Sequence, residues 1–127
     1  MVPIELPYRP NPLNRPRVLV ALKGPALLIP FVMLVDSGAD VSVVPWGLGR
    51  RLGFHEAEGE ATLSIRGIGG NVEARRRSLD VSFGTSGALE IPVLWAALET
   101  PPILGRKGIF DRFRVEFDEC SQVIHFR

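Results

Sequence analysis

Apolar and polar residues alternate along several short segments of the chain, a pattern typical of β-strands with one buried face. The alternation is clearest over residues 60–66 and again over residues 89–95. Residues 27–35 are instead apolar on both faces, as in a strand that is covered on both sides. The pattern therefore predicts a mostly β protein.

These runs and the turn signals between them define the expected elements. We expect strands over residues 17–22, 27–35, 41–44, 60–66, 79–83, 89–95, 103–105, 114–118 and 122–126. Short helical segments are predicted over Pro45–Leu52, with Gly53 as the stop, and over Arg106–Phe113. Pro92 has no N–H to donate, which favours an edge position for its strand.

Proline and glycine are abundant, with 11 and 13 copies in 127 residues. They favour short strands joined by tight turns over a helical bundle. Five of the prolines fall within residues 1–16, which predicts an extended arm that pairs only at a sheet edge. The length, without an internal boundary or repeat, predicts a single domain over residues 1–127.

The charge and the cysteine content limit the cellular compartments and the binding partners that we expect for this protein. The formal net charge of +1 gives no indication of a nucleic-acid or membrane partner. The longest apolar stretch, residues 26–35, is about half a bilayer span and contains Pro30. The single cysteine, Cys120, excludes an internal disulfide and is typical of a reducing compartment. No signal-peptide pattern opens the sequence, and we expect a cytoplasmic protein.

The strand over residues 27–35 leads directly into Asp36-Ser37-Gly38-Ala39-Asp40. A carboxylate at the end of a buried strand costs free energy unless partners hold it there. From this segment alone two interpretations are open: Asp36 caps a helix or turn after a core strand, or it is half of a catalytic pair. The Asp-Ser-Gly unit occurs once, so the other half of such a pair has to come from another copy of the chain.

Two more elements follow in order along the chain. They are a glycine-rich tip at residues 67–71 and Ile103-Leu104-Gly105-Arg106 before a short helical segment. With residues 35–40 they give the chain a resemblance to the retropepsin-like aspartic proteases, the single-domain relatives of pepsin, over about residues 18–113. The resemblance implies a small, closed β-barrel-like fold with a flap hairpin and one or two short helices. It also implies a homodimeric aspartic endopeptidase that acts on extended polypeptides in an apolar cleft without a cofactor.

The resemblance assigns a role to the residues at the start of the loop. Asp36 from each of two subunits would form the catalytic dyad, in which one carboxylate activates a water while the other donates a proton. Ser37 would bridge the two loops by hydrogen bonds. Gly38 would let the substrate backbone come close, which a side chain would prevent.

At the end of the same loop, a residue from another part of the chain would hold Asp40 in place. By the resemblance, Asp40 pairs with Arg106, and Ala39 belongs to the supporting loop. An ordinary surface position for Asp40 is the alternative. Lys107 and Gly108 replace the small polar and apolar residues that viral members usually have after this arginine, which predicts a late start for the helix.

The glycine-rich tip corresponds in position to the flap of these proteases. Gly67, Gly69 and Gly70 would permit opening and closing over an extended peptide, and Ile68 would contact substrate or the partner's tip. A plain hairpin turn is the alternative. A phosphate-binding loop is excluded, because the glycines lie between two strands and open no helix.

The remaining candidates are weaker. Arg75-Arg76-Arg77 is either a nucleic-acid contact or a solvated strand face, and the lack of an aromatic platform favours the solvated face. His55 and His125 have no cysteine or acid at ligand spacing, so no metal site is expected. The apolar candidates for lining a cleft are Val41, Val44, Ile65, Ile68, Val93 and Ile103.

Both ends of the chain differ from the short, interleaved termini of viral members. The proline-rich arm and the tail over residues 114–126 either build a different dimer sheet or cap the edge and keep the chain monomeric. A monomer would fit an alternative function, a non-catalytic retropepsin scaffold for peptide binding or assembly, because one carboxylate cannot supply both the acid and the base.

Overall fold

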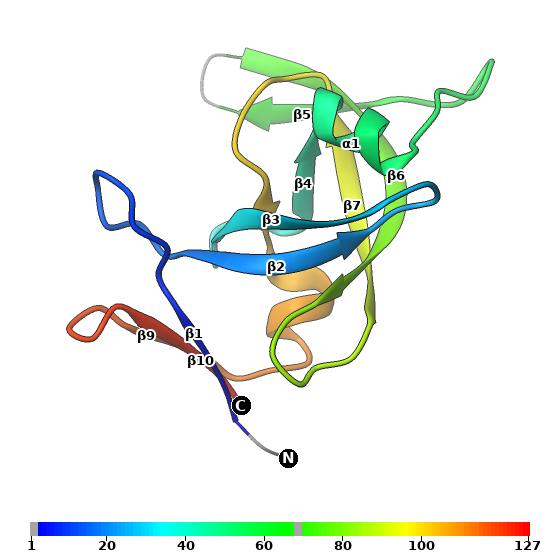
Figure 1. Cartoon of the computed structure of the whole chain (residues 1–127). Coiled ribbons are helices and arrows are strands. Elements are labelled where there is room, and N and C mark those ends of the chain that lie inside the picture. The colour runs from blue at the N-terminus through cyan, green and yellow to red at the C-terminus, as the bar shows by residue number, and fades with distance from the viewer. Residues whose placement is uncertain (1–2, 68–69) are drawn as a thin grey trace.

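The computed structural model describes residues 3–67 and 70–127 (Figure 1). The described residues form ten strands, one α-helix and one short helical turn. The strands are β1 (Ile4–Pro7), β2 (Arg17–Lys23), β3 (Leu28–Val35), β4 (Ser42–Pro45), β5 (Leu63–Gly67), β6 (Gly70–Ser82), β7 (Leu89–Ala96), β8 (Ile103–Leu104), β9 (Val115–Asp118) and β10 (Val123–Phe126). The helix α1 spans Trp46–Leu52 and the turn η1 spans Arg106–Phe110. The predicted mostly β class is confirmed.

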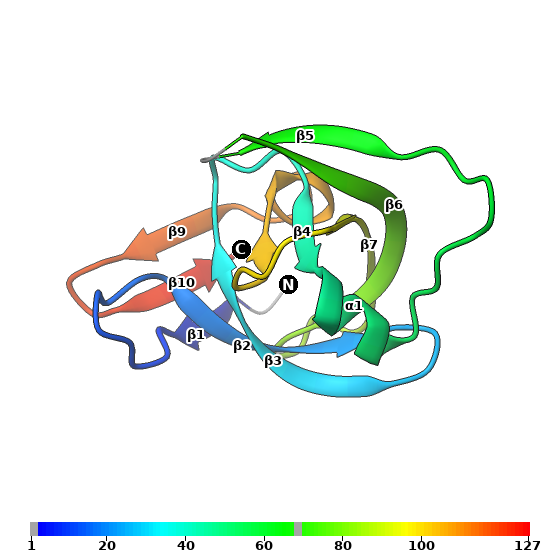
Figure 2. The same ribbon diagram turned by 90° about the horizontal axis from the view of Figure 1, so that it is seen from above.

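The larger sheet closes on itself. Its strand order is β2-β3-β8-β4-β7-β6-β5, and β6 pairs in addition with β2, with Leu22 opposite Val81. This second pairing joins the two ends of a six-stranded ring, which is visible in Figure 2. The closed, barrel-like arrangement expected from the resemblance is therefore present.

Alternation along the strands fills the inside of this ring. In β2, Val18, Val20 and Leu22 are at most 3% exposed, whereas Leu19 between them is 42% exposed. Trp95 of β7 is fully buried and is among the largest side chains of the core. Burying a side chain of this kind contributes about 1.5–3 kcal/mol. The ring is therefore held mainly by apolar packing.

The two ends of the chain form a separate three-stranded sheet in the order β1-β10-β9. The proline-rich arm contributes the edge strand β1, with Ile4 opposite Phe126, as predicted for this arm. The Tyr8 hydroxyl after β1 donates a hydrogen bond to Glu119 Oε1 at 2.8 Å. Burial and this bond raise the pKa of Tyr8 to about 12. The arm is thus fixed to the tail of the same chain.

The edge position predicted for the strand with Pro92 is wrong. Strand β7 lies between β4 and β6. Its pairing with β4 begins only at Val93, opposite Ser42, while Pro92 lies opposite Ser78 of β6. Pro92 therefore falls just outside the β4 ladder, where a missing N–H leaves no partner unsatisfied.

The first helical segment ends as the sequence indicates, whereas the second, predicted over Arg106–Phe113, ends at Phe110. Pro45 precedes α1, and Gly53 ends it with φ 105°, a left-handed conformation that favours glycine. In η1, Lys107 (φ −66°, ψ 122°) and Gly108 (φ 89°, ψ −20°) have the angles of a type II turn. The predicted late start is confirmed, with Phe113 N–H bonding to Ile109 C=O at 3.0 Å. No helix among the described residues is long and apolar enough to cross a membrane.

Candidate active site

Asp36 directly follows the buried end of β3. Met33 and Val35 are at most 2% exposed, Asp36 is half-buried, and Ser37 and Gly38 are exposed. The Gly38 N–H donates to Asp36 Oδ1 at 2.8 Å. This hydrogen bond orients the carboxylate at the surface end of a strand that Met33 and Val35 anchor in the core.

A second segment, residues 102–107, holds this loop from one side. Four backbone hydrogen bonds join the two: Leu34 N–H to Pro102 C=O (3.0 Å), Asp36 N–H to Leu104 C=O (2.9 Å), Arg106 N–H to Ala39 C=O (2.9 Å) and Lys107 N–H to Asp40 C=O (3.0 Å). The bonds extend the parallel pairing of β3 with β8 past the end of both strands. The structure thus brings the two sequence motifs together along their whole length.

Gly105 lies at the centre of this contact. Its N–H donates to Ser42 Oγ at 2.9 Å, and Ser42 is fully buried. A Cβ on Gly105 would lie 2.5 Å from the carbonyl carbon of Val41 and 2.9 Å from the carbonyl oxygen of Ala39, so only glycine fits. Sequence reasoning missed Ser42, whose only signal was a hydroxyl residue within the β-branched run of residues 41–44.

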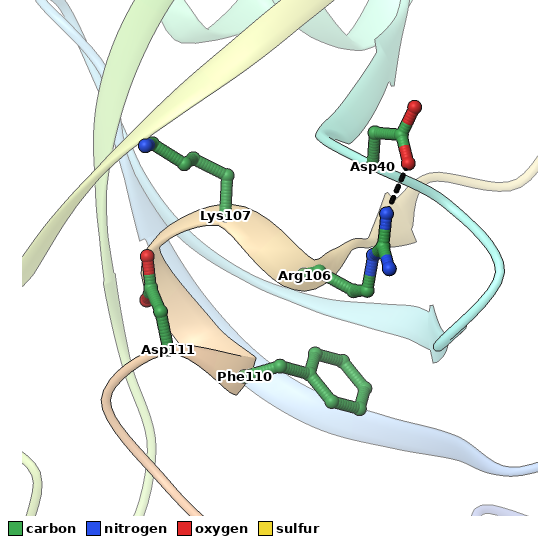
Figure 3. Close-up of a pocket in the computed structure, with 5 residues that line it drawn as sticks. All are labelled: Asp40, Arg106, Lys107, Phe110 and Asp111. Carbon is green, nitrogen blue, oxygen red and sulfur yellow. Dashed lines mark hydrogen bonds and ion pairs between the residues drawn. The ribbon is translucent and has the colours of Figure 1, made fainter.

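Asp40 and Arg106 form an ion pair next to this contact (Figure 3). Their side chains are 83% and 56% exposed, so water screens the pair. The pair lines a shallow hollow of about 370 Å³, together with Lys107, Phe110 and Asp111. Lys107 points away from Asp40 in this view, which leaves Arg106 as the partner of that carboxylate.

The glycine-rich hairpin ends on the same side of the molecule as the loop after β3 (Figure 1). Gly67 pairs with Gly70, where β5 and β6 meet. Ile68 and Gly69, the other two residues expected in the flap, lie outside the described residues. The hairpin is formed by β5 and β6, but strand β5 begins at Leu63, later than predicted.

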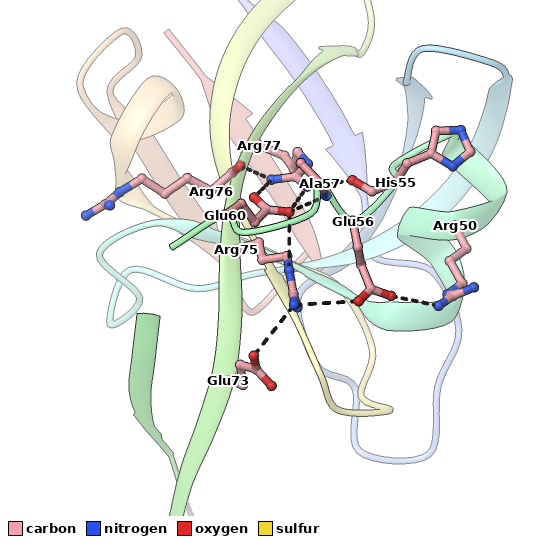
Figure 4. Close-up of polar contacts among 9 residues, drawn as sticks. All are labelled: Arg50, His55, Glu56, Ala57, Glu60, Glu73, Arg75, Arg76 and Arg77. Atoms are coloured by element: carbon pink, nitrogen blue, oxygen red, sulfur yellow. Dashed lines mark hydrogen bonds and ion pairs between the residues drawn. The ribbon is translucent and has the colours of Figure 1, made fainter. Parts of the chain in front are cut away.

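A cluster of charged residues lies at the base of this hairpin (Figure 4). Arg77 donates to both oxygens of Glu60, at 2.7 and 2.9 Å, and Arg75 approaches Glu60 Oε1 at 3.3 Å. The Arg77 hydrogen bonds, with one from Ala57 N–H, lower the pKa of Glu60 to about 2.

The arginines of this cluster also stack on aromatic rings. The Arg75 and Arg77 guanidinium groups each lie 5.3 Å from a ring centroid, over Trp46 and Trp95 respectively. The two side chains are only 13% and 19% exposed. The predicted solvated face is therefore wrong for Arg75 and Arg77 and holds only for Arg76, which is exposed.

Two of the predicted cleft-lining residues belong to the core instead. Val44 is fully buried and Val93 is 1% exposed, because their register turns them into the ring. Val41, Ile65 and Ile103 are half-buried. Ile68 cannot be assigned to either group, because it lies outside the described residues.

No group of three His, Cys, Asp or Glu side chains suited to a metal ion occurs among the described residues. His125 nevertheless has acidic neighbours that its sequence context did not reveal. Its Nδ1 lies 3.4 Å from Glu5 and its Nε2 lies 3.8 Å from Glu116. These acids come from β1 and β9, the strands on either side of β10, so only the sheet brings them together.

The comparisons with known proteins agree with this geometry. The aspartyl protease family model matches residues 18–107, and the chain belongs to that family. The structure is similar to a retropepsin-like aspartic protease from Rickettsia conorii, with a TM-score of 0.71 and 16% identity over 98% of each chain. It is also similar to EIAV protease complexed with the inhibitor HBY-793, with a TM-score of 0.58 and 28% identity over 77% of this chain and 88% of that one. No curated protein sequence matches. The fold is the retropepsin-like fold that the sequence predicted.

Proposed function

We propose that this chain is an aspartic endopeptidase that is active as a homodimer, with Asp36 of each subunit forming a dyad. One carboxylate of such a pair removes a proton from water while the other donates a proton to the peptide carbonyl. In such a dyad the two adjacent carboxylates would share one proton. No metal or covalent nucleophile is needed for this reaction.

The observation that carries the proposal is the way Asp36 is held. Its N–H is fixed by Leu104, its Oδ1 is fixed by Gly38, and its side chain remains partly exposed. Asp40, the other carboxylate of the loop, is paired with Arg106. The second acid of a dyad is therefore best supplied by another copy of the chain, through the same exposed loop.

The other residues of the loop take supporting roles in this proposal. Ser37 is exposed beside Asp36, where its hydroxyl can bond to the partner loop. Gly38 leaves room for the substrate backbone, and Ala39 and Asp40 bind the segment that carries Arg106. Residues 67–70 act as the flap over an extended polypeptide. We place the enzyme, as one domain over residues 1–127, in the cytoplasm, where the exposed Cys120 stays reduced.

Cleavage of a peptide library by wild type and by Asp36→Asn, paired with sedimentation of both, tests the proposal. The expected result is cleavage at acidic to neutral pH by a dimeric wild type and none by Asp36→Asn with unchanged secondary structure. A monomer that binds peptides but cleaves none would instead favour a non-catalytic binding module. Full activity of Asp36→Asn would remove the assigned role of this residue.

A further inference from the structure

A hollow of about 520 Å³ lies away from the Asp36 loop, between β3, α1 and the segment over residues 99–102. Phe31 and Val32 of β3 form one side, and Leu48 and Arg51 of α1 form the other. Its volume falls within the range of pockets that bind small ligands. None of the described residues that are assigned to catalysis or to the flap lines it. We call this hollow the β3 groove.

The edge of β3 in this groove has no partner strand in the described part of the chain. Strand β8 pairs with β3 only at Leu34 and Val35. The N–H groups of Leu34 and Asp36 point toward the β8 side, because they donate to Pro102 and Leu104. Successive residues of a strand point their backbone groups to opposite sides, so those of Val32 also face the β8 side. Val32, which lines the groove, thus has an N–H and a C=O on this side that no residue of the described chain pairs with.

Such an edge can accept an added strand from another polypeptide. The next residue that faces the same side, Pro30, offers a carbonyl but no N–H. This proline limits the length of any added ladder, which protects the edge against indiscriminate pairing. A short extended segment at Val32 therefore fits this edge better than a long strand.

The charges in the groove indicate which segment it accepts. Arg17 and Arg51 line the groove, and neither forms an ion pair within the described residues. The Arg17 Nε atom is buried and has no hydrogen-bond partner in the described part of the chain, so the fold itself leaves this guanidinium group incompletely paired. A carboxylate that reaches the guanidinium groups of Arg17 and Arg51 would therefore be stabilised by charge-assisted hydrogen bonds. Glu99 is the single acidic residue among those that line the groove.

We propose that the β3 groove binds an extended polypeptide segment with acidic side chains, which pairs with the Val32 backbone and places a carboxylate against Arg17 and Arg51. In the proposed peptidase this segment is a part of the substrate beyond the cleaved bond. That role rests on the proposed function, whereas the binding itself does not.

The groove is also connected to the active-site loop. Residues 99–102, which form its third side, lead directly into β8, and the Leu104 carbonyl of β8 holds Asp36. A peptide bound in the groove would therefore contact the segment that leads into β8, next to the residue that holds Asp36, without contacting Asp36 itself.

The test uses the Asp36→Asn protein, so that peptide binding is measured without cleavage. A lack of peptide binding would therefore overturn the groove proposal without bearing on the peptidase proposal. The probe is the fluorescein-labelled peptide Thr-Val-Glu-Val-Glu-Thr, followed by fluorescence anisotropy. Adding Arg51→Gln is expected to weaken binding by about 10-fold, and adding Glu99→Gln to strengthen it by about 2-fold. Arg50→Gln is the matched control, because Arg50 is the neighbouring arginine but pairs with Glu56 outside the groove. It is expected to leave affinity unchanged.

Backbone pairing is tested separately by hydrogen exchange. The Val32 amide is expected to exchange more slowly when the peptide is present, and the matched peptide Thr-Val-Gln-Val-Gln-Thr is expected to bind at least about 10-fold more weakly. Equal affinity of the Arg51→Gln and Arg50→Gln proteins would overturn the proposal. Protection of Val32 that rises with protein concentration in the absence of peptide would also overturn it, because this edge would then belong to a second copy.

Discussion

The backbone N–H of Asp36 donates to the carbonyl of Leu104 at 2.9 Å. The proposed catalytic residue is therefore fixed to β8, a strand that is distant from it in sequence. Next to this bond, the buried Ser42 hydroxyl accepts the Gly105 N–H. The geometry of the active-site loop therefore depends on three residues outside it, Ser42, Leu104 and Gly105. This dependence gives the first prediction.

Replacing Ser42 with alanine should lower the free energy of unfolding by about 1–3 kcal/mol, because it leaves the Gly105 N–H buried without a partner. Urea denaturation measures this change. Ser78→Ala is the control, since Ser78 is exposed on β6 and should change stability by less than about 0.5 kcal/mol. Equal stability of the two variants would show that the Ser42 bond has no structural role.

Removing the ion pair between Asp40 and Arg106 should affect activity far more than stability. An exposed pair contributes only about 0–1 kcal/mol, so Arg106→Gln should unfold at nearly the wild-type urea concentration. If Arg106 braces the loop, kcat/KM should fall by about 10-fold or more. Lys107→Gln, at a side chain that points away from Asp40, is the control. An unchanged kcat/KM in Arg106→Gln would contradict the bracing role.

The attachment of the N-terminal arm can be followed through Tyr8, which is the only tyrosine in the chain. Absorbance at alkaline pH should give a midpoint of about 12, above the ordinary 10.0, because burial and the bond to Glu119 disfavour the ionised form. Since the folded-state pKa is raised, this stabilisation is present below pH 10 and is lost as pH rises toward 12. Glu119→Gln should lower the midpoint but not abolish the shift, because burial remains. A midpoint near 10 would mean that the arm is not docked.

The hydrogen bonds to Glu60 predict that the free energy of unfolding depends on pH in the acidic range. The pKa of Glu60 is lowered from 4.5 to about 2, so its ionised form stabilises the fold above pH 4.5, and this contribution is lost as pH falls toward 2. The difference in unfolding free energy between wild type and Glu60→Gln should therefore be largest at neutral pH and shrink in acid. Glu58→Gln, in the same exposed loop, should show no such trend. A constant difference across this range would contradict the assigned pKa.

Local patterns were sufficient to predict most of the fold. Alternation identified the strands, Gly53 marked the end of α1, and Lys107-Gly108 indicated the late helical turn. Each of these features depends on residues that are close in sequence. The order of elements 35–40, 67–71 and 103–106 then indicated the family.

Apart from misplaced element ends, such as the later start of β5, the errors involve contacts between distant strands. Pro92 favours an edge in isolation, and only the register of β4 shows that β7 can be central. Arg75 and Arg77 are polar by type, yet Trp46, Trp95 and Glu60 from other elements cover them. Val44 and Val93 point into the ring because of the register in which β4 and β7 pair. A pattern along one strand does not specify which strand lies beside it.

The central claim is that two Asp36 residues from two chains form one active site. Refolding wild type together with a threefold excess of Asp36→Asn tests it most directly, by the rate of peptide cleavage per wild-type chain. Random pairing leaves about one wild-type chain in four with a wild-type partner, so the account predicts that this rate falls to about a quarter. An unchanged rate per wild-type chain would contradict the account, because each chain would then be active without a second Asp36.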